Sequence, residues 1–183
     1  MRLLTGSPDL RRDFLDDILS ITDPQFSGIK KHYIRALVQR NNLLKQGKSN
    51  IHDQVFVWNI RLSELAGYIA QARYALIERF NANISDIYST IATKKNTVRL
   101  QYTTPLRIEN YESQLLQMLE QHLSKDIERG FTAYGPHRED FSIELRDVAA
   151  KASASRGETR TLVLSLKLLE LSLLKETRST KPL

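Results

Sequence analysis

The sequence contains no cysteine among its 183 residues. This excludes disulfide bonds and thiolate metal sites and suits a reducing cytoplasm. The longest apolar run, residues 162–174, is interrupted by Lys167 and Glu170 and is too short to span a bilayer. The N-terminus lacks the apolar core of a signal peptide. These absences predict a cytoplasmic protein with no membrane partner.

Patterns of a self-contained catalytic centre are also missing. There is no Gly-x-Ser-x-Gly nucleophile elbow, and the four histidines are scattered without the spacing of metal ligands. The adjacent acids Asp16-Asp17 and Glu139-Asp140 would point apart on a helix or strand, so we expect both pairs on solvated surface. Neither a complete catalytic centre nor a metal site is predicted.

The segment Gly47-Lys48-Ser49 looks like the end of a phosphate-binding P-loop but fails the full pattern. A P-loop has another glycine five residues earlier and a strand leading into it. Position 42 is occupied by Asn42, and a helical pattern leads in. Nucleotide binding by a P-loop is therefore not expected in this chain.

Basic residues exceed acidic ones, and the formal net charge of +6 favours a polyanionic partner such as nucleic acid. The interval from residue 24 to residue 52 contains no acid. At about 100° per residue, Lys31, Arg35 and Lys45 fall within a sector of roughly 80°. This face is either a solvated surface or a phosphate-backbone contact. The DNA-binding candidates are Lys30, Lys31, Arg35, Lys45 and Lys48.

Apolar periodicity predicts a helical first half. Ser7-Pro8-Asp9 has the residues of a helix start, and a second helix should run from Asp23-Pro24 to a break at residues 47–50. Its predicted apolar side is Tyr33, Ile34, Leu37, Asn41 and Leu44. A heptad seam follows, made of Val55, Trp58, Leu62, Leu65, Ile69, Ala72 and Leu76. If this helix ran unbroken from Asp53 to Ile91, it would be about 58 Å long. We expect it to form a helical arm, a hairpin in which the second helix packs against it.

The second half predicts strands and helices in turn. Alternating apolar residues indicate strands at residues 97–102, 131–134 and 141–145, the last two around a turn at Gly135-Pro136. A helix from Tyr111 to Ile127 should close at Gly130. The final helix, residues 158–177, is apolar nearly all round and should be buried against a sheet. The layout predicts a mostly helical α+β protein: a helical insertion in an incomplete α/β domain.

Two polar motifs carry most of the functional information. Ser155-Arg156-Gly157-Glu158 stands before the apolar final helix. It fits a capping box, and it also fits a serine, a glycine amide and a helix N-terminus that face a phosphate. The segment from Gly135 to Asp140 is either a tight turn with exposed charges or an edge that meets an anionic ligand or partner.

Taken together, these motifs resemble the RecF family of bacterial recombination proteins along essentially the whole chain. The residues that carry the resemblance are Gly6-Ser7-Pro8, Arg11-Arg12, Phe14-Leu15-Asp16, Tyr33, Arg40-Asn41, Leu44-Lys45, Trp58, Ala72-Arg73, Glu78-Arg79, Gly135-Pro136-His137-Arg138, Ser155, Gly157-Glu158 and Arg160-Thr161-Leu162. That family is an SMC-like ATP-binding-cassette (ABC) ATPase with a helical domain inserted in its head. Other SMC-like cassette proteins fit less well, because a long coiled coil is absent.

The resemblance implies a helical inserted arm domain over residues 1–128 and a partial ATPase head over residues 129–183. It implies that Ser155, Arg156, Gly157 and Glu158 act in trans on the γ-phosphate of ATP held by a second protomer. Arg156 and Glu139 depart from the usual family residues, which affects details of the site. The role of Gly135-Pro136-His137-Arg138 stays open. The Walker A and Walker B motifs of the family do not occur in this sequence.

The family activity implied is a weak DNA-dependent ATPase that binds double-stranded DNA and gap junctions. Such a protein dimerises on ATP with Mg and helps to load recombinase with RecR and RecO during repair, recombination, replication and the SOS response. We expect this chain alone to bind no cofactor and to be inactive as an ATPase. The alternative is a nucleotide-independent helical module that binds DNA or protein through its basic arm.

Overall fold

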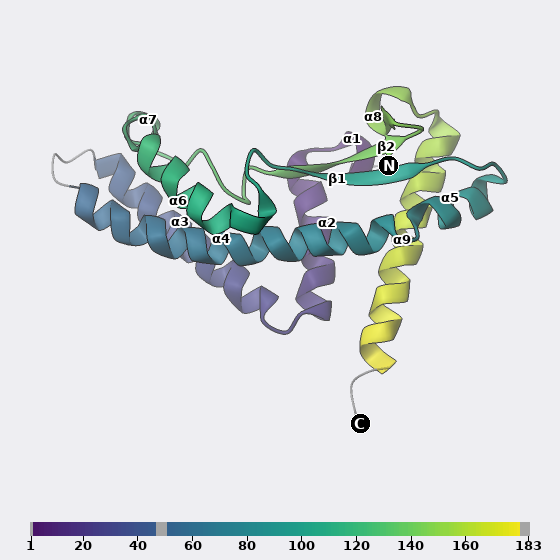
Figure 1. The fold of residues 1–183 in the computed structure, drawn as a ribbon, viewed down its shortest axis with the longest axis horizontal. Coiled ribbons are helices and arrows are strands. Elements are labelled where there is room, and N and C mark those ends of the chain that lie inside the picture. The colour runs from purple at the N-terminus through teal and green to yellow at the C-terminus, as the bar shows by residue number, and fades with distance from the viewer. Residues whose placement is uncertain (1, 47–50, 180–183) are drawn as a thin grey trace. The chain divides into compact units, whose positions relative to one another are not determined.

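The computed structural model describes residues 2–46 and 51–179, which form helices and one three-stranded sheet (Figure 1). In chain order the helices are α1 (Arg2–Thr5), α2 (Pro8–Thr22), α3 (Phe26–Gln46), α4 (His52–Asn81), α5 (Ile84–Ala92), the 3₁₀ helix η1 (Ile108–Asn110), α6 (Tyr111–Gln121), α7 (Leu123–Arg129), α8 (Ala150–Ser153) and α9 (Arg156–Ser179). The strands are β1 (Val98–Thr103), β2 (Asp140–Leu145) and β3 (Val148–Ala149). Among the described residues, none of the helices combines the length and hydropathy needed to cross a bilayer.

The chain forms two compact units, each assembled from segments that are distant in sequence. Unit 1 comprises Met1–Pro24, Arg73–Thr103 and Asp140–Leu183, and unit 2 comprises Gln25–Ala72 and Thr104–Glu139. Helix α4 contributes to both, up to Ala72 in unit 2 and from Arg73 in unit 1. This grouping differs from the contiguous division at residue 128 expected from the sequence.

The sheet of unit 1 is antiparallel in the order β1-β2-β3. Val98 lies opposite Leu145, and Leu100 opposite Ile143, so the apolar residues of both strands share the buried face. The predicted strands at residues 97–102 and 141–145 are confirmed. The strand predicted at residues 131–134 is wrong, because the N–H groups of Thr132 and Ala133 donate to the side chains of Asn41 and Asp126 instead of a neighbouring strand.

The third helix does not continue unbroken to Ile91, because the chain breaks between α4 and α5. Asn81 ends α4 and exchanges two hydrogen bonds with the backbone of Leu100, at 2.8 and 2.9 Å. Ser85, in the first turn of α5, does the same with Val98 at 3.0 Å. These side chains satisfy backbone groups of β1. The helix therefore ends where its polar residues meet the strand, and α4 is about 45 Å long.

Helix α9 is buried on one side only, which corrects the prediction of a helix buried all round against a sheet. Its buried side, Leu162, Leu166, Leu169 and Leu173, packs against helices α5 and α2. Leu164, Leu168 and Leu171 are 41–53% exposed. The apolar residues of α9 therefore lie on two faces of the helix, and the described part of the chain covers only one of these faces.

Unit 2 contains the predicted pairing of the second and third helices. Leu44 of α3 and Val55 of α4 pack in one apolar cluster with Leu123 of α7 and with Ile51, which directly precedes α4. Ile34, expected on the apolar side of α3, is 48% exposed.

The helix predicted from residue 111 to residue 127 divides at His122 into α6 and α7, and Gly130 closes α7 in the left-handed conformation as predicted.

A buried ion pair joins α2 to α4 within unit 1. The guanidinium of Arg73 donates to both carboxylate oxygens of Asp16, at 2.8 and 2.9 Å, and both side chains are almost fully buried. Burial lowers the pKa of Arg73, but the hydrogen bonds and charge of Asp16, with a smaller contribution from Tyr102, outweigh it and raise the pKa above its ordinary value. Asp16 is therefore not a surface residue, whereas Asp17 is exposed as predicted.

Replacing Asp16 with alanine should lower the free energy of unfolding by about 3–5 kcal/mol, because it leaves the guanidinium of Arg73 buried without its counter-ion. The matched change Asp17→Ala removes an exposed carboxylate from the next position and should alter stability by about 0.5 kcal/mol or less. Urea unfolding followed by circular dichroism measures both. Equal losses in the two variants would contradict the assigned role of Asp16.

Candidate functional site

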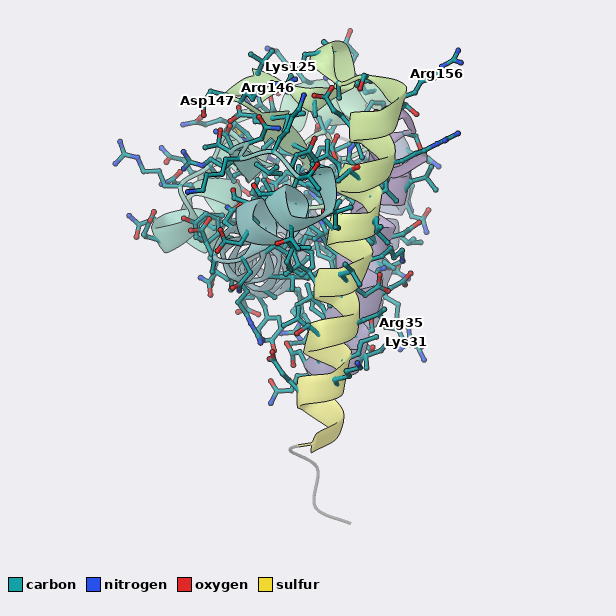
Figure 2. All side chains as sticks on the ribbon, turned by 90° about the vertical axis from the view of Figure 1, so that its right-hand side faces the viewer. Lys31, Arg35, Lys125, Arg146, Asp147 and Arg156 are labelled. Carbon is teal, nitrogen blue, oxygen red and sulfur yellow. The ribbon has the colours of Figure 1, made fainter. Side chains whose placement is uncertain are left out.

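The Ser155–Glu158 turn lies between α8 and the first turn of α9, in unit 1. The Oγ of Ser155 accepts the N–H of Glu158 at 3.2 Å, and Glu158 Oε2 accepts the N–H of Ser155 at 2.8 Å. These reciprocal bonds form the predicted capping box. Ser155, Arg156 and Gly157 are exposed, and Arg156 points away from the ribbon in Figure 2. The turn therefore presents its backbone and hydroxyl to solvent in a fixed conformation.

Gly157 has space around it. A Cβ added at this position would meet Ser155 Oγ at 4.0 Å, which is ordinary van der Waals contact. Packing within the described chain does not account for a glycine here. Its small size leaves the N-terminal amides of α9 open to an approaching group.

The charge of Glu158 is balanced by an arginine that sequence analysis did not select. Arg146 Nη1 donates to Glu158 Oε1 at 2.7 Å. This bond and those with Ser155 lower the pKa of Glu158 to about 2. Burial raises the pKa of Tyr88, and the negative charge of Glu158 raises it further. The sequence indicated the Ser-x-Gly-Glu motif but not its arginine partner, because Arg146 lies 12 residues away from Glu158 and outside any local pattern.

A hollow of about 540 Å³ adjoins this turn. It is lined by Tyr88, Ala92, Lys94, Asn96, Arg146, Ser155, Gly157, Glu158 and Thr161. Lys94 and Arg146 supply two cationic groups and Glu158 supplies one anionic group. The lining therefore combines a helix N-terminus, a serine hydroxyl and a net positive charge, which together suit a phosphate group.

The Gly135-Pro136-His137-Arg138 element turns inward in unit 2. Gly135 has φ +126°, and an added Cβ would lie 2.8 Å from Tyr33 Oη. The Nε2 of His137 donates to the carbonyl of Thr132 at 3.1 Å, so in the neutral ring Nδ1 accepts from Tyr33 Oη at 2.6 Å. Arg138 is exposed and its guanidinium lies 4.9 Å from the ring centre of Phe131. Of this element, Arg138 is the residue that faces solvent with a charge.

Two buried carboxylates adjoin this element. The carboxylate of Glu139 accepts hydrogen bonds from Thr104 and Tyr111, each at 2.7 Å, and is buried. Asp126 accepts from the fully buried Arg40 at 2.8 Å, and Arg40 also donates to Thr132. The prediction that Glu139 lies on solvated surface is therefore wrong. Its neighbour Asp140, in unit 1, is half-buried and pairs with Arg11 at 2.6 Å.

The basic face of α3 is exposed at Lys31, Arg35 and Lys45. Lys31 and Arg35 are labelled next to each other at the edge of the view in Figure 2. Lys30 is half-buried, and the candidate Lys48 lies outside the described residues. Arg40, from the same basic interval, is buried with Asp126 and is unavailable to a ligand. In the described part of the chain, no group of three or more side chains has the arrangement of a metal site.

Comparisons with known proteins give one consistent result, although no protein-family model matches the chain. The chain is 30% identical over 183 residues to the DNA replication and repair protein RecF of Clostridium novyi, covering all of this chain and 50% of that protein. It is 32% identical to the RecF of Crocosphaera subtropica over 99% of this chain and 52% of that protein. The chain thus spans about half the length of these relatives.

A solved structure described as the recombination mediator protein RecF-ATP in the RecFOR pathway has the same fold. It aligns with a TM-score of 0.90 and 26% identity, over 99% of this chain and 50% of that one. A companion structure, described as RecF-ATPrS, aligns equally well. This confirms the predicted fold class, a helical arm with part of an ABC-type ATPase head.

Replacing His137 with alanine should lower the free energy of unfolding by about 1–3 kcal/mol, because it removes the hydrogen bonds to Tyr33 and Thr132. The neighbouring change Arg138→Ala removes an exposed cation–π contact and should cost about 0.5–1 kcal/mol. Urea unfolding of both variants tests the inward role of His137. If Arg138→Ala lost more free energy of unfolding than His137→Ala, the structural role assigned to His137 would be contradicted.

Proposed function

Because the chain is RecF-like in sequence and fold along its whole length, we propose that it supplies two parts of a DNA-repair ATPase: the helical arm and the head segment that carries the Ser155–Glu158 motif. The observation that carries this proposal is the exposed, capped turn at Ser155–Glu158, with an open glycine at the N-terminus of the 24-residue helix α9. In the complete protein this turn would contact the γ-phosphate of ATP bound by a second protomer. ATP and Mg would be held by segments that carry a P-loop, a pattern this sequence lacks.

The capping box and the phosphate contact are chemically compatible. The cap uses a lone pair of Ser155 Oγ, so the hydroxyl hydrogen can still donate to a phosphate oxygen. The N-terminal amides and the dipole of α9 favour an anion, and Gly157 lets it approach. Arg156 adds an exposed positive charge, while Glu158 is held by Arg146 and acts as a cap.

We propose that the exposed bases of α3 contact the phosphate backbone of double-stranded DNA. Lys31, Arg35 and Lys45 are exposed in a chain with a net charge of +6. Such contacts are independent of sequence and sensitive to salt. ATP-dependent dimerisation, gap recognition and recombinase loading with RecR and RecO complete the proposal. A nucleotide-independent DNA- or protein-binding module is the second candidate, favoured by the same basic face.

The in-trans role can be tested in a chimera, in which this chain replaces the matching half of the Clostridium novyi RecF. We expect Mg-ATP to promote dimerisation of the chimera, measured by analytical ultracentrifugation, whereas this chain alone should show no saturable ATP binding by calorimetry. Ser155→Ala should weaken dimerisation about tenfold, because a hydrogen bond to a charged group contributes about 1.5 kcal/mol. The control Ser153→Ala changes an exposed serine just before the turn and should dimerise normally. Undiminished dimerisation of Ser155→Ala would contradict the in-trans role.

The DNA role predicts that charge reversal at Lys31, Arg35 and Lys45 to glutamate weakens double-stranded DNA binding at least tenfold. It should also reduce the slope of log K against log salt by roughly 2–3, since about 0.9 is lost per phosphate contact. The control reverses Lys95, Arg99 and Lys151, exposed bases of unit 1. Both triples take the formal net charge from +6 to zero. Equal losses measured by fluorescence anisotropy would show an effect of net charge and not of the α3 face.

A further inference from the structure

Arg146 occupies an unusual place in the backbone of unit 1. With Asp147 it forms the two-residue connection between β2 and β3, and both residues have positive φ, 57° and 60°. Such turns suit the twist of a hairpin but favour glycine or asparagine. The N–H of Arg146 donates to the carbonyl of Thr97 at 2.9 Å. The strands thus fix the position from which the side chain of Arg146 extends.

From this position the side chain reaches the start of α9. Arg146 Nη1 bonds one carboxylate oxygen of Glu158, and the other oxygen accepts the N–H of Ser155. Glu158 in turn donates its own N–H to Ser155 Oγ. The three residues therefore connect the hairpin to the exposed turn, and the two hydrogen bonds to the Glu158 carboxylate are charge-assisted, a kind that is shorter and stronger than neutral bonds.

The charge of Glu158 matters for any anion that approaches this turn. A carboxylate within a few ångströms of a phosphate would repel it. Arg146 neutralises that charge, and Lys94 in the same hollow adds a positive one. Tyr88, the remaining titratable group of the lining, has a pKa raised by burial and is therefore neutral near pH 7.

We propose that Arg146 is a positioning residue for the phosphate-binding turn: it clamps Glu158, and through Glu158 it holds Ser155 and Gly157 in the conformation that receives an anionic phosphate. The proposal rests on the proposed function of this turn. Arg146 is assigned this role because its guanidinium bonds the Glu158 carboxylate and so acts through Glu158.

An exposed ion pair of this kind adds little to global stability, so Arg146→Gln should unfold at nearly the same urea concentration as the unchanged chain. The effect should be local. Loss of the guanidinium removes the hydrogen bond that contributes most to the low pKa of Glu158. This pKa should therefore rise from about 2 toward its ordinary value of about 4.3. Because the folded-state pKa is the lower one, the clamp is complete above about pH 4.3 and is lost as pH falls toward 2.

The first measurement follows the side-chain carboxyl of Glu158 by NMR across pH in this chain. The control is Arg79→Gln, which removes another exposed arginine–glutamate pair, with Glu176, from the same unit. The Glu158 pKa should rise in Arg146→Gln and stay low in Arg79→Gln. Arg146→Lys keeps a positive charge and should give an intermediate value. An unchanged Glu158 pKa in Arg146→Gln would overturn the clamp.

The second measurement compares the same substitutions in the chimera of this chain with the Clostridium novyi RecF. Arg146→Gln should weaken Mg-ATP-dependent dimerisation about tenfold, with partial rescue in Arg146→Lys and no loss in Arg79→Gln. Full dimerisation of Arg146→Gln would overturn the positioning role and leave the proposed function intact. If Mg-ATP does not promote dimerisation of the chimera with Arg146 unchanged, the proposed function is overturned, and the positioning role with it.

Discussion

Burial of arginine is the constraint on which both units depend. A guanidinium keeps its charge at any physiological pH, so burying it demands a carboxylate with matching geometry. In unit 1 the pair of Arg73 and Asp16 joins α2 to α4 across 57 positions of sequence. In unit 2 Arg40 and Asp126 join α3 to α7 across 86 positions. Each pair joins segments that no local pattern brings together.

This constraint also explains what the family-like residues do. Asp16, Arg73, Arg40, Asn41, Tyr33 and His137 all carry the resemblance, and all make hydrogen bonds within a unit. They hold the scaffold and are not free to bind a ligand. The Ser155–Gly157 turn and the bases of α3 are, by contrast, exposed. Functional proposals therefore belong to these two surfaces, and the scaffold residues determine how rigidly the surfaces are presented.

Much of the local structure was readable from the sequence. The strands at residues 98–103 and 140–145, the helix start at Ser7-Pro8, the left-handed cap at Gly130 and the capping box of Ser155 and Glu158 followed from short-range patterns. Two errors in secondary structure arose where a polar side chain replaced a backbone partner. Asn41 and Asp126 bind the segment predicted as a strand at residues 131–134, and Asn81 ends the helix expected to continue to Ile91.

Most secondary-structure types and the capping chemistry of the Ser-x-Gly-Glu turn could be predicted from the sequence, because they depend on residues within a few positions of one another. The family resemblance could also be predicted, because its motifs recur in order along the chain. Only the tertiary structure decided which charges are buried, which face of α9 is covered and which arginine balances Glu158. Asp16 and Asp17 are adjacent and chemically identical, yet Asp16 is buried and Asp17 exposed. Their environments differ because α2 presents only one of them to Arg73, and the position of that arginine depends on the folded chain.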